Sequence, residues 1–260
     1  MDTPVALSIA GSDPSGGAGL QADLKTFHRM GVYGEAVVTL ITVQNTRGLR
    51  RVEALEAGLV AEQLHAVITD IPPKAAKTGA LGSLAVVRVV AEAAASFAFP
   101  LVVDPVKLSK NGMALMDAEA RQVFIEKLLP HAFLLTPNLD EASDLSGIEA
   151  RDPESMTRAA EKLIQMGAAN VLVKGGHLEG DAIDVLVTRE GVRREYRAAK
   201  IVTPHTHGTG CTYSAAITAE LAKGFALTEA IRIAKGFITE AIRTNPGLGL
   251  SGPLNHFAGK

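Results

Sequence analysis

VALSIAGSDPSGGAGLQADLKTFHRM (residues 5–30) contains the pattern that sets the fold of this 260-residue chain. It begins with an apolar run at residues 5–10, passes through a glycine-rich turn and ends in a stretch of helical periodicity over residues 18–30. A strand, a turn and a helix in this order form the repeating unit of parallel α/β proteins. The stretch therefore predicts a βα unit at the start of the chain.

The same alternation of short apolar runs and helical stretches continues along the chain. It predicts further strands at 36–43, 75–78, 101–104, 132–136 and 171–174, and helices at 60–69, 83–96, 117–128, 153–166, 209–223 and 227–243. Two alternating runs at 183–188 and 192–196 flank a glycine-containing connection, which is typical of a β-hairpin. We therefore expect an α/β fold in which helices cover both faces of a mainly parallel sheet with an antiparallel edge hairpin.

Composition narrows the class of protein. The 26 basic and 28 acidic residues nearly balance, so no basic footprint indicates nucleic acid or an anionic membrane, and we expect small-molecule partners. One cysteine excludes an intrachain disulfide framework, and seven scattered histidines show no zinc-ligand spacing. With no signal-peptide pattern at Met1 and no membrane-length apolar run, we expect a cytoplasmic protein with one domain over residues 1–260.

THGTGCTYSAA (residues 206–216) places a second glycine-rich turn directly before a helix that carries the only cysteine, Cys211. Glycines allow a backbone to expose its N–H groups, and the positive end of a helix favours a phosphate or a developing oxyanion. The alternative is an ordinary loop around Gly208 and Gly210 before a core helix, with Cys211 as a small buried hydrophobe. The segment alone does not decide between them.

Polar residues stand where several predicted strands end, which is where ligands bind in open α/β sheets. Gln44 offers a planar amide that suits the edge of an aminopyrimidine, or it is a loop amide. Gly17-x-Gly19-x-x-Ala22 is a weak dinucleotide signal, because the second strand ends without the acidic residue that holds a ribose. No Gly-x-x-x-x-Gly-Lys-Ser/Thr and no Gly-x-Ser-x-Gly occurs, which argues against a P-loop and an α/β-hydrolase.

Acids and lysines at other strand ends suit phosphate chemistry. Asp104 and Glu141 are candidates for binding Mg²⁺ and its waters, although Asn138 and Glu141 could equally form a helix capping box. Lys174 could neutralise a transferring phosphate. For His177 we expect a structural or surface role, and for Lys77 we prefer a solvated side chain over one that reaches the ligand.

Taken in order, these segments closely resemble the bacterial hydroxymethylpyrimidine/phosphomethylpyrimidine kinases, which belong to the ribokinase-like superfamily. The resemblance covers almost the whole chain and rests on residues 10–27, 44–46, 77–79, 104–106, 136–138, 174–177 and 206–216. It implies a three-layer αβα sandwich, ATP with Mg²⁺, and two successive phosphorylations that start from 4-amino-5-hydroxymethyl-2-methylpyrimidine, in the synthesis of thiamine diphosphate.

The resemblance also implies roles for individual residues. The pyrimidine pocket would be lined by Gly11, Ala18, Asp23, Val43, Gln44, Ala80 and Lys107. Catalysis would fall to the anion hole and its neighbours, Gly208, Thr209, Gly210, Cys211 and Lys174. The nucleotide phosphates would contact Lys174, Thr206, Gly208 and Gly210, with Asp104 and Glu141 at the metal.

The resemblance implies that Cys211 takes the proton of the substrate hydroxyl as a thiolate. That role requires the helix N-terminus to lower the pKa of the thiol. Phosphoryl transfer depends mostly on positioning and charge neutralisation, so we expect the backbone hole to matter more than this base. Two residues depart from the family pattern: Lys107 replaces an apolar residue, and Ala80 replaces a methionine of some relatives.

Two other functions stay open. A pyridoxal kinase would use the same phosphate machinery, although Gln44 favours the aminopyrimidine, and a non-catalytic pyrimidine-binding regulator could keep the fold. We also expect a homodimer, because exposed sheet edges and apolar helices often pair. Residues 11–19 and 107–112 are candidate lids over the ligands.

Overall fold

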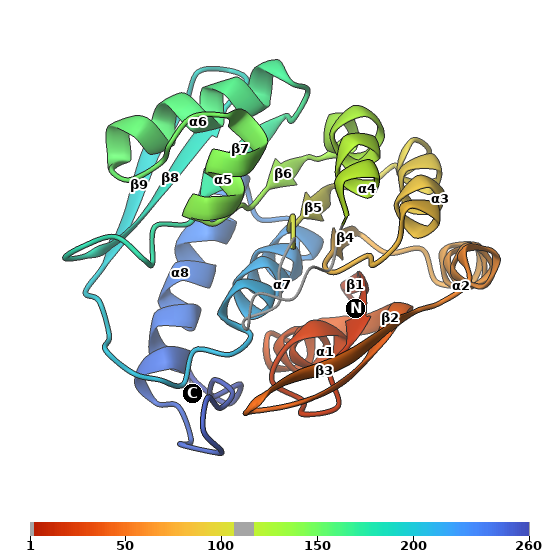
Figure 1. Cartoon of the computed structure of the whole chain (residues 1–260), viewed down its shortest axis with the longest axis horizontal. Coiled ribbons are helices and arrows are strands. Elements are labelled where there is room, and N and C mark those ends of the chain that lie inside the picture. The colour runs from red at the N-terminus through yellow and green to blue at the C-terminus, as the bar shows by residue number, and fades with distance from the viewer. Residues whose placement is uncertain (1–2, 107–116, 260) are drawn as a thin grey trace.

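The computed structural model describes residues 3–106 and 117–259 (Figure 1). In these residues one sheet runs in the spatial order β3-β2-β1-β4-β5-β6-β7-β8-β9. Its strands are β1 (Val5–Ser12), β2 (Tyr33–Asn45), β3 (Gly48–Ala54), β4 (Ala75–Thr78), β5 (Leu101–Val103), β6 (Leu134–Leu135), β7 (Asn170–Val173), β8 (Ala182–Thr188) and β9 (Arg193–Ala198). Neighbouring strands in the run β2-β1-β4-β5-β6-β7 pair in parallel. Strand β3 pairs antiparallel with β2, and β8 pairs antiparallel with both β7 and β9. The mainly parallel sheet and the edge hairpin β8–β9 are thus confirmed.

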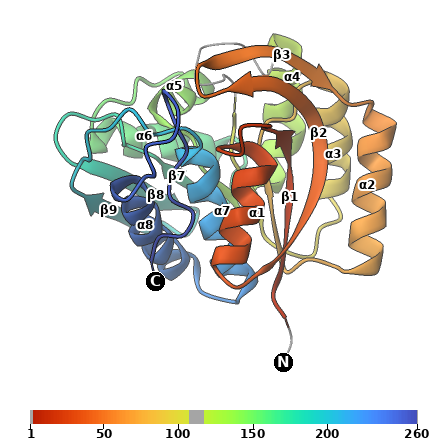
Figure 2. The same ribbon diagram turned by 90° about the horizontal axis from the view of Figure 1, so that it is seen from below.

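Helices cover both faces of the sheet, which confirms the three-layer sandwich (Figure 2). One face carries α1 (Gly19–Arg29), α7 (Thr209–Ala222) and α8 (Leu227–Arg243). The other carries α2 (Ala57–Asp70), α3 (Leu84–Ala94), α4 (Ala118–Val123), α5 (Leu139–Ser146) and α6 (Pro153–Gln165). After α4 the chain continues through a π-helical turn, η1 (Phe124–Leu128), and a 3₁₀ turn, η2 (Leu129–His131). Each face has its own cluster of buried apolar side chains.

Three elements differ from the sequence prediction. Strand β3 was not expected, because its residues GLRRVEA carry charges and none of them is buried. Strand β2 is longer than predicted, since beyond its pairing with β1 it continues as a two-stranded arm with β3. Helix α5 follows the capping sequence at residues 138–141, where only the start of a helix was foreseen. Elements supported by partners or caps, not by apolar periodicity, are the ones the pattern missed.

Helix α7 is the structural centre of its layer. Every residue from Thr212 to Ala222 is buried, and the helix packs between α1 and α8 against the sheet. A helix that is buried on all sides has no solvent face and is held from every direction. Its first turn is therefore rigidly placed beside the carboxyl ends of β1, β4 and β5.

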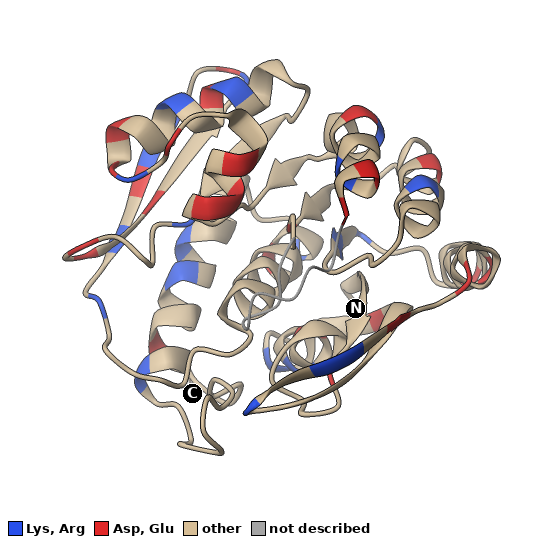
Figure 3. Ribbon diagram, viewed as in Figure 1, with Lys and Arg blue, Asp and Glu red and all other residues tan. Residues whose placement is uncertain are grey.

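Charged side chains of both signs are mixed over the outer helices in the view of Figure 3. In the described part of the chain, no helix combines the length and the apolar character needed to cross a membrane.

Candidate active site

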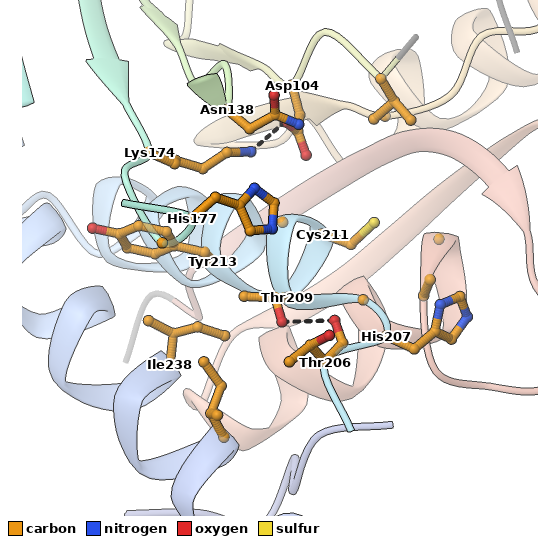
Figure 4. Close-up of a pocket in the computed structure, with 18 of the residues that line it drawn as sticks. Asp104, Asn138, Lys174, His177, Thr206, His207, Thr209, Cys211, Tyr213 and Ile238 are labelled. Carbon is orange, nitrogen blue, oxygen red and sulfur yellow. Dashed lines mark hydrogen bonds and ion pairs between the residues drawn. The ribbon is translucent and has the colours of Figure 1, made fainter. Parts of the chain in front are cut away.

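A cavity of about 660 Å³ lies at the carboxyl ends of the parallel strands, within the size range of small-molecule sites (Figure 4). Its wall combines residues that follow β1, β4, β5, β6 and β7 with the first turn of α7. Of the site residues expected from sequence, it includes Gly11, Ala18, Gln44, Ala80, Asp104, Glu141, Lys174, Thr206, Gly208, Thr209, Gly210 and Cys211. His177, for which we expected a structural or surface role, also lines the cavity.

The first turn of α7 presents unpaired backbone donors to this cavity. Gly208 occupies the N-cap position with a φ of 80°, and a Cβ at this position would collide with the carbonyl oxygen of Gly17. No side chain caps the helix, and among the described residues the N–H groups of Gly210 and Cys211 find no acceptor. Such groups at the positive end of a helix attract anions. The geometry favours an anion site over an ordinary loop.

An ion pair lies against this turn. The Nζ atom of Lys174 is 2.8 Å from Oδ1 of Asp104, and the side chains are 13% and 3% exposed. A Cβ on Gly210 would stand 3.3 Å from that Nζ, so any larger residue at position 210 would push against the ammonium. Burial lowers the pKa of Lys174, but the carboxylates of Asp104 and Glu141 outweigh it and raise that pKa above its usual value. Lys174 therefore keeps its positive charge beside the anion site.

Glu141 combines a structural role with a place in the cavity wall. Its backbone N–H donates to Oδ1 of Asn138 at 2.9 Å, and its Oε2 accepts from the Asn138 N–H at 2.8 Å, so the capping box is formed. Burial, against the lowering effect of Lys174 and with a contribution from the charge of Asp104, raises the pKa of Glu141 to about 7. If Asp104 and Glu141 held a divalent cation, its positive charge would offset this cost.

The donor set around these acids is small. Within residues 3–106 and 117–259, no group of three or more His, Cys, Asp or Glu side chains is placed to hold a metal ion. Mg²⁺ usually keeps several waters and binds through one or two carboxylates together with substrate phosphates. Asp104 and Glu141 therefore fit Mg²⁺ as a phosphate-bound ion, not as an ion in an all-protein cage.

The thiol of Cys211 is less acidic than its role as a base requires. Burial raises its pKa to about 11, although the ammonium of Lys77 and the N–H of Gly19 act in the opposite direction. The base role requires the helix N-terminus to lower this pKa, and in the ligand-free site that condition is not met because desolvation is the larger effect. At neutral pH the thiol is protonated.

Asp23 and Lys77 lie beneath the cavity and do not line it. Both side chains are 0% exposed, and Nζ of Lys77 is 2.8 Å from Oδ1 of Asp23. This corrects the preference for a solvated Lys77, and it places Asp23 behind the wall where we expected pocket contact. Lys77 lies on a central strand whose residues are all buried, so its charge needs a buried partner.

The end of β2 contributes one face of the strand to the site. Thr42 and Gln44 line the cavity, whereas the side chain of Val43 is on the opposite face and 49% exposed. The pairing of β2 with β3 shifts register between Val43 and Gln44, and only Gln44 of the two is among the residues that line the cavity. The structure thus brings Gln44 to the cavity and leaves Val43, which we expected in the pocket, outside its lining. Lys107 and the candidate lid at residues 107–112 lie outside the described residues.

Sequence reasoning missed a carboxylate–imidazole pair. Nε2 of His207 lies 2.9 Å from Oδ2 of Asp13, and the same carboxylate accepts N–H groups from Ser15, Gly17 and Ala18 at 2.8, 3.2 and 2.8 Å. Burial raises the pKa of Asp13, but the bonds from His207 and Ser15 outweigh it and lower that pKa below its usual value. An aspartate that accepts N–H groups a few residues ahead is a known sequence signal for a turn. No local pattern indicates that Asp13 also binds His207, which is 194 residues away in sequence.

A free helix N-terminus, a buried lysine–carboxylate pair and two acids around one cavity fit the class of phosphate-transferring enzymes on an α/β scaffold. Comparison with known proteins gives the family. A family profile described as phosphomethylpyrimidine kinase matches residues 13–255, and the chain belongs to this family.

Individual relatives agree with this assignment. The chain is 46% identical over 260 residues to a hydroxymethylpyrimidine/phosphomethylpyrimidine kinase of Rhizobium meliloti, covering 98% of this chain and 97% of the relative. It is also 46% identical over 253 residues to a thiamine biosynthesis bifunctional protein of Geobacter sulfurreducens, covering 96% of this chain but only 51% of that longer protein.

Solved structures include both kinds of vitamin kinase. A phosphomethylpyrimidine kinase of Clostridium difficile matches with a TM-score of 0.81 at 44% identity over 92% of this chain and 99% of that one. A Bacillus subtilis pyridoxal kinase solved with ADP matches with a TM-score of 0.90 at 39% identity over 99% and 98%. A Staphylococcus aureus pyridoxal kinase with AMP-PCP and pyridoxal matches with a TM-score of 0.89 at 34% identity over 98% and 94%.

Proposed function

We propose that this kinase transfers the γ-phosphoryl group of ATP to 4-amino-5-hydroxymethyl-2-methylpyrimidine and then to the resulting monophosphate, in the synthesis of thiamine diphosphate. The observation that carries the proposal is the shared cavity, in which unpaired N–H groups at the start of α7 face the same space as the amide of Gln44. The first feature suits a transferring phosphoryl group. The second suits the hydrogen-bonding edge of an aminopyrimidine.

In the first step, the substrate hydroxyl oxygen forms a bond to the γ-phosphorus while the bond to the β–γ bridging oxygen breaks. ADP leaves with that electron pair, and the hydroxyl proton must pass to a base. The N–H groups of Gly210 and Cys211 and the ammonium of Lys174 stabilise the charge on the transferring group. The Cys211 thiol, placed in the same wall, is the candidate base once bound groups have lowered its pKa.

A comparison of the two phosphorylations tests whether Cys211 acts as the base. The attacking group is then a phosphate oxygen, which near neutral pH carries negative charge and has little need of a base. Cys211→Ala keeps the backbone N–H and removes only the thiol. We expect it to slow the first phosphorylation by about 10²–10⁴-fold and the second by much less. Equal losses in both steps, measured with each substrate supplied separately, would assign the side chain to packing and not to proton transfer.

We propose that Asp104 and Glu141 hold Mg²⁺ together with waters and the nucleotide phosphates, where the ion would neutralise phosphate charge. The support is the raised pKa of Glu141, to which burial and Asp104 both contribute. Glu141→Gln should raise the Mg²⁺ concentration for half-maximal activity by about 10–100-fold. An unchanged Mg²⁺ dependence would restrict Glu141 to its capping box.

Pyridoxal kinase is the second candidate, because the solved pyridoxal kinases match nearly the whole chain. The deciding experiment measures ADP formation with the pyrimidine, its monophosphate and pyridoxal offered separately. We expect the highest kcat/KM with the two pyrimidines, and a higher value with pyridoxal would reverse the order of the candidates. Tight pyrimidine binding without ATP turnover would instead indicate a regulator.

We further propose a cytoplasmic homodimer. The lone cysteine suits a reducing compartment. Ile41 and Val43, each 49% exposed on the outer face of β2, would be covered by a second copy. Light scattering should give twice the chain mass, and Val43→Lys should shift it toward the monomer. A monomer at micromolar concentration would contradict this part of the proposal.

A further inference from the structure

Beneath the first turn of α7 lies a charged cluster that the chemistry above does not use. It consists of Ser8, Asp23 and Lys77, and all three side chains are fully buried. Oδ1 of Asp23 is 2.8 Å from Nζ of Lys77, and Oδ2 of the same carboxylate accepts from Oγ of Ser8 at 2.6 Å. Both carboxylate oxygens and the ammonium are therefore satisfied inside the protein.

Strand register points this cluster toward α7. Ser8 on β1 and Lys77 on β4 are Cα partners, and their neighbours two residues earlier, Ala6 and Ala75, pack in the apolar cluster shared with α1 and α7. Since residues two apart share a face of a strand, Ser8 and Lys77 point into the same helical layer. A Cβ on Gly79, which lines the cavity, would stand 3.9 Å from Nζ of Lys77. The ammonium thus lies one layer below the cavity.

The charges around Cys211 come from several elements. Lys77 on β4 favours a negative charge at the thiol, whereas Asp23 on α1 and Asp104 after β5 oppose it. The ammonium of Lys174 after β7 also interacts with Cys211. Among these groups, Lys77 and Asp23 are fully buried and are not among the residues that line the cavity, so bulk water does not screen their charges.

Stability does not explain why such a pair is present. Replacing a buried ion pair by neutral groups of similar volume often leaves stability unchanged or increases it, because desolvation consumes the attraction. A buried charge close to a reacting group, in contrast, stabilises charge that develops there without reorganisation.

We propose that Lys77 is a positioning residue for phosphoryl transfer: Asp23 and Ser8 hold its ammonium beneath the first turn of α7, where it stabilises negative charge on Cys211. The inference rests on the proposed function of Cys211. Lys77 favours the thiolate form of Cys211 and Asp23 disfavours it, so the two residues have opposite effects on ionisation of the thiol.

The effect of each residue on ionisation of Cys211 can be measured without any substrate. Cys211 is the only cysteine, so the rate of alkylation by iodoacetamide at one fixed pH reports on a single sulfur atom. Asp23→Asn removes the negative charge that opposes the thiolate, while its amide oxygen can still accept from the Lys77 ammonium, so it should speed alkylation. The double variant Lys77→Met/Asp23→Asn removes both charges and should alkylate more slowly than wild type. We expect the two variants to differ by about tenfold, the effect of one unit of pKa on the thiolate fraction.

Lys223→Met is the matched control, because Lys223 forms an ion pair with Glu220 at the far end of the same helix. It should alkylate at the wild-type rate. Equal rates for Asp23→Asn, the double variant and wild type would overturn the proposal. If one of the variants does not fold, as judged by circular dichroism, the other is compared with wild type, for which the expected direction is already stated.

Steady-state kinetics separate this role from packing. Neither Lys77 nor Asp23 lines the cavity, so the double variant should lower kcat for the first phosphorylation and leave both KM values within about twofold. Raised KM values with unchanged kcat would show a distorted pocket and contradict the proposal. Because alkylation needs neither pyrimidine nor ATP, its result stands even where the substrate assay contradicts the proposed function.

Discussion

Two glycine-rich turns lead into helices in this protein, and they differ in whether a side chain of the protein already binds their N–H groups. In the turn before α1, the carboxylate of Asp13 accepts the N–H groups of Ser15, Gly17 and Ala18, so the chain supplies its own anion. Neither helix has a side-chain cap at its N-cap residue, but among the described residues no carboxylate accepts the N–H groups of Gly210 and Cys211 at the start of α7, which stay available for a ligand. Similar sequences thus form a scaffold in one place and a binding site in the other.

The first turn also supports the second. Gly208 packs against the carbonyl oxygen of Gly17, and His207 bonds to Asp13 at 2.9 Å. The two contacts lie on consecutive residues at the head of α7, so the internally satisfied turn fixes the angle at which the free N–H groups face the cavity.

Gly208→Ala should break this arrangement with the largest effect. The new Cβ would meet the Gly17 carbonyl at a backbone φ of 80°, so the two turns must separate. We expect kcat to fall by about 10²–10³-fold, the effect of losing one anion-hole donor. The measurement is kcat at saturating ATP and pyrimidine.

Gly224→Ala is the control for backbone strain alone. Gly224 has a similar φ of 87° beyond the other end of α7, and a Cβ added there would meet no atom of the described residues within 4 Å. It should cost about 1 kcal/mol of stability and leave kcat unchanged. Similar kcat losses in both variants would mean that the head of α7 has no special role.

Asp13→Asn should affect stability more than catalysis. The amide oxygen can accept some of the same N–H groups but loses the charge, so we expect a loss of about 1–3 kcal/mol in the free energy of unfolding and less than about tenfold in kcat. A larger loss of kcat with little change in unfolding would mean that the first turn also binds a ligand.

The pH dependence gives this prediction a sign. The pKa of Asp13 is lowered in the folded protein, because the bonds from His207 and Ser15 outweigh burial. The carboxylate therefore contributes its stability above the unfolded-state pKa of about 4 and loses it as the pH falls through the folded-state value. The difference between wild type and Asp13→Asn should be constant near neutral pH and shrink in acid, as measured by chemical denaturation.

The contrast between the two turns also shows what sequence could predict. The βα order, the edge hairpin and the head of α7 followed from local patterns of apolar residues and glycines, and the structure contains all three. The partners of Asp13 and Lys77 did not, because His207 and Asp23 are 194 and 54 residues away in sequence and meet them only in the folded chain. The raised pKa of Cys211 could not be predicted for a related reason: a local pattern indicates a helix N-terminus but not how deeply the thiol beside it is buried.

The smallest expected effect is the most direct test of the comparison. Inorganic phosphate, a simple anion, should bind the open turn before α7 and not the turn that Asp13 already fills. At ten times its dissociation constant it should raise the free energy of unfolding by about 1.4 kcal/mol. This stabilisation should persist in Asp13→Asn variants that fold and disappear in Gly208→Ala, with sodium chloride at equal ionic strength as the control. Since general salt effects act on every variant alike, the difference between wild type and Gly208→Ala isolates the bound anion. The same stabilisation in Gly208→Ala would place the anion elsewhere and remove the distinction between the two turns.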